Sequence, residues 1–448
     1  YCEGSGYICT WAFGHLVSLY DCSDYKEEWK SWKSIPVIPT KFKIKLNSSS
    51  GVKEQMEVIK KLINRDDVTT IVCATDAGRE GELIFRHIYN YLRCKKPIER
   101  LWINSMVEED IKKGFENLED GDSDKYINLY ECAYAREQAD WLVGINMTRC
   151  FSNMYSAYGE KPLSIGRVQT PTLKMIVDRE KEISSFVRNY YYKAQIHYDD
   201  IVAEYDVKFE NRDEAESIVR AVDGTCSIIQ SVKREIKRKK APMLFDITLL
   251  QKECNKRLGL NAKNTLDVAQ SLYEKKLITY PRTDSKFLNA SMEIEARNLA
   301  EQICSQRDIN VTINTKAVID DTKVSDHHAI IPTVKALHVN SLNETERDVL
   351  EMIMLRFIVS MSPAMLYEHV STSIKAGDYI FKANANRTIE SGWTALDFED
   401  RTNSIDAEKQ DKNIRLFEYK ENDSWQQIES NVNSIETKPK QRFTDDTL

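Results

Sequence analysis

The pattern of hydrophobic and polar positions changes character along the chain. Residues 51–118 alternate helix-like and strand-like segments; within them, 69–74 predict a short buried strand and 81–92 the helix that follows it. From residue 108 to 182 the apolar positions recur with a helical period, and between 129 and 148 they form one apolar face. The first part of the chain therefore predicts an α/β pattern followed by helices.

The second half of the chain predicts strands interrupted by helices. Short alternating runs, typical of half-buried strands, fill residues 190–232 and 366–435. A helical block, 241–363, separates them. Its first part predicts two helices, 246–258 and 264–276, joined by a short turn. The simplest topology is one strand-built domain that is interrupted by an inserted helical domain.

Composition agrees with an ordinary folded protein. The 448 residues suffice for roughly three domains, and no apolar run approaches the roughly 20 residues of a spanning helix. We therefore expect a cytoplasmic chain without a membrane anchor. The ten cysteines never form Cys-x-x-Cys, so zinc ribbons and disulfide frameworks are disfavoured, and we interpret the cysteines as reduced, mostly buried thiols.

The net charge of −7 argues weakly against a polyanionic partner, so the local distribution of charge matters more. Residues 233–240 hold six Lys or Arg against Glu235 alone. Such a run is usually a solvated surface, although it is also able to contact phosphates.

An acidic motif follows the predicted strand at 69–74. Asp76, Glu80 and Glu82 lie within seven residues, interleaved with glycines, directly before a helix. Carboxylates at the carboxyl end of a strand face the crevice where α/β sheets bind ligands, and this set suits Mg²⁺. The alternative is that the two glutamates only stabilise the positive end of the helix dipole.

A second motif contains Tyr280, Pro281 and Arg282. Proline favours an extended conformation for the residue before it, and residues i and i+2 of an extended chain face the same side. Tyr280 and Arg282 should therefore project together, where a guanidinium favours a phenolate and grips a phosphate. Taken alone, Tyr-x-Arg is more often structural. The two helices before it also allow a DNA-binding module of helix-turn-helix type, although the second helix carries few basic residues.

Two further motifs are weaker alone. In the first, 325–333, His327 and His328 could hold a phosphate or shuttle a proton, although paired histidines are more often packing or capping residues. In the second, 161–173, Ser164 could cap a helix, and Arg167 and Gln169 could meet phosphates and base edges. An ordinary loop leading into a helix explains this second motif equally well.

Taken together and in this order, these motifs resemble the type IA DNA topoisomerases, and among them the bacterial topoisomerase III group. The resemblance rests on five segments in family order: Asp-x-Gly-Arg-Glu-Gly-Glu at 76–82, Ala-Arg-Glu-Gln-Ala-Asp-Trp-Leu at 135–142, Ser-Ile-Gly-Arg-Val-Gln-Thr-Pro at 164–171, Ile-Thr-Tyr-Pro-Arg-Thr-Asp-Ser at 278–285 and Asp-His-His-Ala-Ile-Ile-Pro-Thr at 326–333. The end of the chain, 442–448, also resembles the family's return into its helical domain.

The resemblance implies an α/β and α+β multidomain protein that forms a torus. The implied parts are a partial Toprim α/β domain (1–107), a helical domain (108–186), a β-rich arch (187–240 and 364–436), an inserted helical, winged-helix-like domain (241–363) and a return to the helical domain (437–448).

It also implies an isomerase that cuts one DNA strand, passes another through the gap and reseals it without ATP. Tyr280 would become linked to a 5′ phosphate, Arg282 would stabilise the phosphoryl charge, and His327 would lie beside the scissile phosphate. The remaining implied roles are Mg²⁺ binding by Asp76, Glu80 (also catalytic) and, more weakly, Glu82, and DNA contacts by Arg167, Gln169, Arg136 and Arg442. The implied substrate is the single-stranded parts of supercoiled or catenated DNA. We further expect a nucleoid-associated monomer, with a helicase as a candidate partner.

Two departures from the family pattern qualify these expectations. Gly78 stands where the family often has Asp, which should weaken metal affinity. The family's first Toprim strand, with its catalytic Glu and Lys, has no match, and the chain opens at Tyr1. We therefore expect an internal fragment that binds DNA yet cleaves it poorly. A DNA-binding module without activity, or a Toprim nuclease or primase, are the alternatives.

Overall fold

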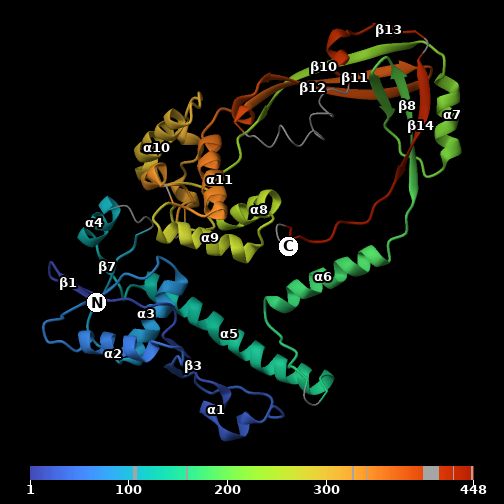
Figure 1. The fold of residues 1–448 in the computed structure, drawn as a ribbon. Helices are drawn as coiled ribbons and strands as arrows, with labels where there is room; N and C mark the ends of the chain where they lie inside the picture. The colour runs from blue at the N-terminus through green and yellow to red at the C-terminus, as the bar shows by residue number, and fades with distance from the viewer. Residues whose placement is uncertain are drawn as a thin grey trace. The chain divides into compact units, whose positions relative to one another are not determined.

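The computed structural model describes residues 1–103, 108–157, 160–324, 327–339, 341–396, 413–426, 428–444 and 447–448. It divides into two compact units, residues 1–177 and 178–448, and each unit is described by itself (Figure 1). Within the described ranges, no helix combines the length and the apolar character needed to cross a membrane.

The first unit contains a small sheet that confirms the predicted α/β pattern. Strands β5 (Ile71–Cys73) and β6 (Ile98–Arg100) are parallel, and β7 (Glu119–Asp120) pairs antiparallel with β6. Parallel strands need a crossover connection, and helix α3 (Arg79–Tyr91) supplies it. The helix begins two residues before the predicted start at Gly81. The smaller elements around this sheet are β1 (Cys2–Gly4), β2 (Tyr7–Cys9), β3 (Val17–Leu19), α1 (Cys22–Tyr25), η1 (Glu27–Lys30), β4 (Ile44–Leu46), α2 (Val52–Ile63) and α4 (Glu108–Glu116).

Two helices confirm that much of 108–182 is helical, but the apolar face expected at 129–148 is not buried: of its positions only Ala133 is, whereas Cys132, Ala139 and Val143 are exposed. Helix α5 (Asp124–Tyr155) packs against α3, and its polar side chains hold the preceding loops. Asn146 bonds both the N–H and the C=O of Val37, at 2.6 and 2.9 Å, and Arg149 donates to the carbonyl of Trp29 at 2.8 Å. Helix α6 (Gln169–Ser184) follows. Because it begins at Gln169, Ser164 does not cap it, contrary to our expectation; the Ser164 hydroxyl instead accepts a bond from the Gln169 amide at 2.8 Å.

The second unit is built on one seven-stranded sheet that unites both predicted β-rich stretches. The strand order is β13-β10-β11-β12-β9-β8-β14, with antiparallel pairing throughout. Helix α7 (Arg212–Val222) lies against β8 and β14 and was not predicted from the strand-like pattern around it (Figure 1). The strands are β8 (Tyr190–Tyr198), β9 (Ile201–Tyr205), β10 (Ser227–Lys239), β11 (Met365–Ala376), β12 (Tyr379–Glu390), β13 (Ser424–Trp425) and β14 (Glu429–Glu436), with 3₁₀ turns η6 (Gly392–Ala395) and η7 (Ile414–Glu418).

The helical block is inserted between two adjacent strands of this sheet, as predicted. The chain leaves the sheet after β10 and returns in β11, and these strands are paired up to Lys239 and Met365. The predicted helix pair is present as α8 (Ile247–Leu258) and α9 (Ala262–Glu274), joined through Gly259 in the left-handed conformation. The block also contains α10 (Glu293–Gln306), α11 (Glu344–Ser360) and the 3₁₀ turns η2 (Ala290–Met292), η3 (Thr315–Ala317), η4 (Asp321–Lys323) and η5 (Val334–His338).

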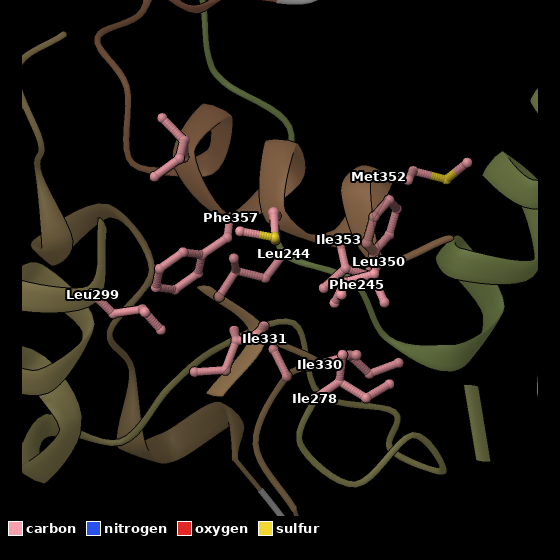
Figure 2. Close-up of a cluster of buried hydrophobic side chains, with 14 of the residues drawn as sticks. Leu244, Phe245, Ile278, Leu299, Ile330, Ile331, Leu350, Met352, Ile353 and Phe357 are labelled. Carbon is pink, nitrogen blue, oxygen red and sulfur yellow. The ribbon is translucent and has the colours of Figure 1, made fainter. Parts of the chain in front are cut away.

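A single apolar core holds the helical block together. Figure 2 shows Phe357 and Ile353 of α11 directed towards Ile278, Ile330 and Ile331, which come from the segments around the two predicted catalytic motifs. Because both motif segments contribute buried side chains to this core, packing fixes them next to each other.

The expectation about the cysteines needs correction, whereas the basic run is a largely exposed surface, as such runs usually are. The cysteines are not mostly buried: Cys22, Cys73, Cys254 and Cys304 are, whereas the others are partly or fully exposed. The basic run at 233–240 lies largely on strand β10 and is partly neutralised within its own strand, since Lys233 lies 2.7 Å and Lys237 lies 3.7 Å from Glu235.

Candidate active site

The acidic loop of the first unit is shaped by a close backbone approach. At Gly81, a Cβ atom would lie 2.1 Å from the carbonyl oxygen of Asp76, which no side chain tolerates. The Thr75 hydroxyl donates to the Gly81 carbonyl at 2.9 Å, and the Gly78 N–H donates to the Asp76 carbonyl at 2.9 Å. The glycines therefore let the loop fold tightly against the start of α3, as the motif predicted.

A buried arginine on strand β6 fixes the backbone of the same loop through hydrogen bonds. Arg100, at the end of β6, is fully buried and donates to the carbonyls of Thr75 and Asp76 at 2.8 and 2.7 Å. Its Nε lies 2.6 Å from Oε1 of Glu82, which is 1% exposed. Burial raises the pKa of Glu82, and the charges of Arg100 and Arg86 oppose this rise. The arrangement gives Glu82 a structural partner in the interior and does not favour the metal role implied for it.

Two carboxylates remain on the exposed side of the loop. Asp76 and Glu80 are exposed, and Oε1 of Glu80 lies 2.7 Å from Nε2 of His15. Mg²⁺ is commonly held by one or two carboxylates together with water and phosphate oxygens, so these two residues fit that ion. Among the described residues there is no group of three or more His, Cys, Asp or Glu arranged to hold a metal by itself.

A buried acid–histidine pair behind the loop was missed by sequence reasoning. On α5, burial and the nearby charge of Glu80 raise the pKa of Glu137 to about 7. Burial lowers the pKa of His87, on α3, to about 4. Oε2 of Glu137 and Nε2 of His87 are 3.5 Å apart. With these pKa values His87 is neutral near pH 7 and Glu137 is about half protonated. Glu137 lies in a motif that the sequence analysis quoted, but its burial depends on tertiary packing.

The tyrosine motif of the second unit lies on an irregular segment that bends at Thr279 and Pro281, rather than in the strand that we expected. Ile278 forms an isolated bridge with Pro332, and regular pairing ends there. Beyond it, burial alternates: Pro281 and Thr283 are buried, whereas Arg282 is exposed and Tyr280 is partly exposed. Tyr280 and Arg282 are thus both more exposed than the residues that alternate with them; that they project together stays a prediction.

Backbone bonds tie this segment to the histidine motif. The Thr279 N–H donates to the Ile331 carbonyl at 3.0 Å, and the Thr283 hydroxyl donates to the His327 carbonyl at 2.9 Å. The rings of Tyr280 and His327 are 4.5 Å apart between centroids. The structure thus brings together Tyr280 and His327, which are far apart in sequence. Ser325 and Asp326 of the same motif lie outside the described residues.

The second histidine and the helix-turn-helix-like pair have structural roles. His328 is buried, and its Nδ1 lies 2.8 Å from the Ala329 carbonyl, as expected of a packing residue. Helix α9 buries Thr265, Ala269 and Leu272. On the exposed side of this helix, Lys263 is accompanied by Asp267, a mixture of charges that does not favour insertion into a DNA groove.

The implied DNA-contacting residues are held by acidic partners. Both Arg136 and Arg167 approach Asp140, and Arg167 does so with two bonds of 2.6 and 3.3 Å. Hydrogen bonding to Arg167 lowers the pKa of Asp140. In the second unit, Arg442 binds both carboxylate oxygens of Glu180 at 2.7 and 3.0 Å. These arginines are exposed and oriented, but each is also paired within the chain.

Comparisons with known proteins cover the whole chain. A family model described as DNA topoisomerase matches residues 124–448, and a Toprim domain model matches residues 2–106. The DNA topoisomerase 3 of Bacillus subtilis is 38% identical over 465 residues, covering 100% of this chain and 63% of that protein. The DNA topoisomerase 3 of Bacillus licheniformis is 38% identical over 467 residues, covering 100% of this chain and 62% of the relative.

A solved structure agrees in fold. The full-length topoisomerase I of Thermotoga maritima matches 99% of this chain and 71% of that chain, with a TM-score of 0.71 and 24% sequence identity. The chain spans slightly less than two thirds of the length of its two Bacillus relatives. Because the topoisomerase model covers more than half of the chain and the Toprim model precedes it, the chain belongs to the DNA topoisomerase family, type IA.

Proposed function

We propose that this chain cleaves and reseals one strand of DNA, with Tyr280 as the nucleophile. The observation that carries the proposal is the position of Tyr280: its residue is partly exposed, the ring of His327 lies 4.5 Å from its own, and exposed Arg282 follows two residues along. Arg282 is exposed, and a guanidinium binds phosphate oxygens well.

The proposed step exchanges one ester for another. The Tyr280 oxygen loses its proton and attacks the phosphorus, a P–O bond to tyrosine forms, and the bond to the 3′ oxygen of the upstream nucleotide breaks. That oxygen takes up a proton and leaves as a 3′ hydroxyl, and religation is the same step in reverse. The phosphotyrosine conserves the energy of the broken ester, so resealing needs no external energy source. Arg282 and a protonated His327 would stabilise the charge on the phosphoryl oxygens.

In this proposal Asp76 and Glu80 would hold Mg²⁺. When bound, Mg²⁺ supplies positive charge to phosphate oxygens. Glu82 and Arg100 act by fixing the backbone of the loop, which agrees with their burial and their 2.6 Å contact. The exposed arginines Arg136 and Arg167 would exchange Asp140 for phosphates of a single strand, with Arg442 and Gln169 as further contacts, so affinity should fall as salt rises. The toroidal arrangement, the finer domain division, a monomeric state and a helicase partner also stay predictions.

The test compares Tyr280→Phe with Tyr273→Phe. Tyr273 is a matched control because its ring contacts that of Tyr280, with centroids 5.3 Å apart. Each protein is incubated with Mg²⁺ and a single-stranded oligonucleotide labelled at its 3′ or its 5′ end, and is then denatured. We expect the unaltered chain and Tyr273→Phe to retain the 3′ label covalently, because tyrosine is joined to the 5′ phosphate of the downstream fragment.

The result for Tyr280→Phe and the pattern of labels decide between this proposal and its alternatives. Tyr280→Phe should lose the adduct but keep its affinity for the oligonucleotide. A covalent adduct in Tyr280→Phe, retention of the 5′ label, or no adduct from the unaltered chain at saturating Mg²⁺ would refute the proposal. Cleavage without an adduct would instead indicate a nuclease.

A further inference from the structure

Two cysteines face each other across the first hairpin of the chain. Strands β1 and β2 are antiparallel, and Cys2 is the direct register partner of Cys9. Directly opposite residues of an antiparallel pair point to the same face of the sheet. Both cysteines are exposed, so their thiols share one accessible face of the hairpin. This pair was not recognisable as Cys-x-x-Cys, since the two positions meet only through the turn.

The spacing of antiparallel strands suits a covalent link between these residues. Opposite Cα atoms are about 5.5 Å apart in hydrogen-bonded pairs and about 4.5 Å in the other pairs. A disulfide requires about 4.4–6.8 Å between Cα atoms, so either class of pair satisfies it. The turn at Ser5 and Gly6 has positive φ at both residues, 51° and 79°, which matches the tight hairpin turn that fixes this register.

Contacts on both sides of the hairpin keep the two strands in place. Glu3 accepts two bonds from Arg65, at 3.0 and 3.1 Å. The ring of Tyr7 meets that of Phe115 edge-on, with centroids 5.1 Å apart. The two thiols are therefore presented by a hairpin that the rest of the first unit supports, and their meeting does not rely on chance encounters of a mobile segment.

We propose that Cys2 and Cys9 form a reversible disulfide, with glutathione disulfide as the oxidant. One cysteine thiolate attacks a sulfur of glutathione disulfide, and a mixed disulfide forms as one glutathione thiolate leaves. The other cysteine then attacks the sulfur of its partner, which releases the second glutathione. Two cysteine thiols are oxidised to one disulfide, one glutathione disulfide is reduced to two glutathione molecules, and the two protons pass to the released thiolates.

The hairpin should make this pair react differently from the other exposed cysteines. Cys226 and Cys132 are also exposed, and their sulfurs contact residues other than cysteine: the sulfur of Cys226 contacts Gln426, and that of Cys132 contacts Arg79. We expect these two positions to stop at the mixed disulfide with glutathione. The proposal does not depend on any DNA chemistry of the chain.

The experiment equilibrates the folded chain in buffers with increasing ratios of oxidised to reduced glutathione. Free thiols are then blocked, and chymotryptic cleavage after Tyr7 separates Cys2 from Cys9, so that a link between them appears as two joined peptides lacking two hydrogen atoms. We expect this link to form at a lower ratio than the glutathione adduct of Cys226. In Cys2→Ser, Cys9 should instead carry glutathione, and in Cys226→Ser the link should be unchanged.

Two results would overturn the proposal. One is separate glutathione adducts on Cys2 and Cys9, appearing at the same ratio as the adduct of Cys226. The other is formation of the Cys2–Cys9 link at the same glutathione ratio in urea, because the proposal attributes the link to the folded hairpin and not to closeness in sequence.

Discussion

Replacing Glu137 by Gln should remove a pH dependence from the stability of the first unit. The Glu137 side chain is only 24% exposed, and burial raises its pKa from the ordinary value of 4.5 to about 7. Folding therefore favours the protonated acid. Above pH 4.5 the unfolded chain ionises freely while the folded chain does not, so the free energy of unfolding falls as pH rises and levels off above pH 7.

The size of the effect follows from the shift. One pKa unit corresponds to about 1.4 kcal/mol, so ionised Glu137 costs the folded state about 3 kcal/mol at pH 8 and less than about 1 kcal/mol at pH 5. Glutamine has nearly the same shape and stays neutral. The free energy of unfolding of Glu137→Gln, measured relative to that of the unaltered chain, should therefore be about 2 kcal/mol higher at pH 8 than at pH 5. The lowered pKa of His87 makes the free energy of unfolding fall as pH drops below 6.5, but His87 is present in both proteins.

Amide hydrogen exchange within α3 and α5 measures this difference, because it reports the opening free energy of the first unit alone. The buffers are free of divalent metal ions, so that metal binding at the neighbouring acidic loop does not contribute. Glu131→Gln is the matched control, since Glu131 is an exposed glutamate on the same helix. If Glu137→Gln and the unaltered chain change in parallel from pH 5 to pH 8, Glu137 is ionised in the folded state at ordinary pH and the reasoning is wrong.

Three other substitutions test the packing. Gly81→Ala should lower the free energy of unfolding of the first unit by about 3 kcal/mol or more, because the new Cβ would overlap a carbonyl oxygen. Gly144→Ala is the control: its Cβ would have no neighbour closer than 4.0 Å, so this change should be neutral or slightly stabilising. Urea unfolding of the two variants measures the difference. Arg100→Met should cost about 3 kcal/mol in the same assay, because buried Glu82 would keep only the more distant Arg86, at 3.8 Å, and a loss below about 1 kcal/mol would contradict the pairing. Asn343→Ala should cost about 1 kcal/mol by removing the cap of α11, and thermal unfolding of the second unit would show a shift too small to measure if the cap contributes nothing.

Local chemistry made much of the second unit predictable from sequence. The proline predicted an extended chain around Tyr280, but the chain bends at Thr279 and Pro281, so only the exposure of Arg282 and the partial exposure of Tyr280 agree with that expectation. The contact between Tyr280 and His327 joins segments 47 residues apart in number (327 − 280), and only the shared core shows why they meet. The implied metal role of Glu82 illustrates the limit. Sequence spacing placed it beside Glu80, but its environment depends on Arg100, which lies on another strand.

The predictions for helix α7 and for the cysteines failed for a different reason. The helix is short and amphipathic, and its capping residue Asn211 is the one local sign of its start, with a side chain that accepts the Asp213 N–H at 3.0 Å. Between strand-like runs, that sign was overlooked. Burial of cysteines follows from the average behaviour of thiols, whereas exposure of Cys2 and Cys9 is set by a two-stranded hairpin too small to have an interior of its own.

The double attachment of the helical block limits the ways in which it can move. Its two ends leave the sheet as neighbouring strands, with Lys239 opposite Met365, and neither end is a single flexible linker. A body held by one covalent strand can spin about that strand, whereas one held by two paired strands moves only as far as the paired ribbon bends or twists. Any excursion of Tyr280 with its block should therefore deform the ribbon at Lys239 and Met365, whose pairing resists free rotation.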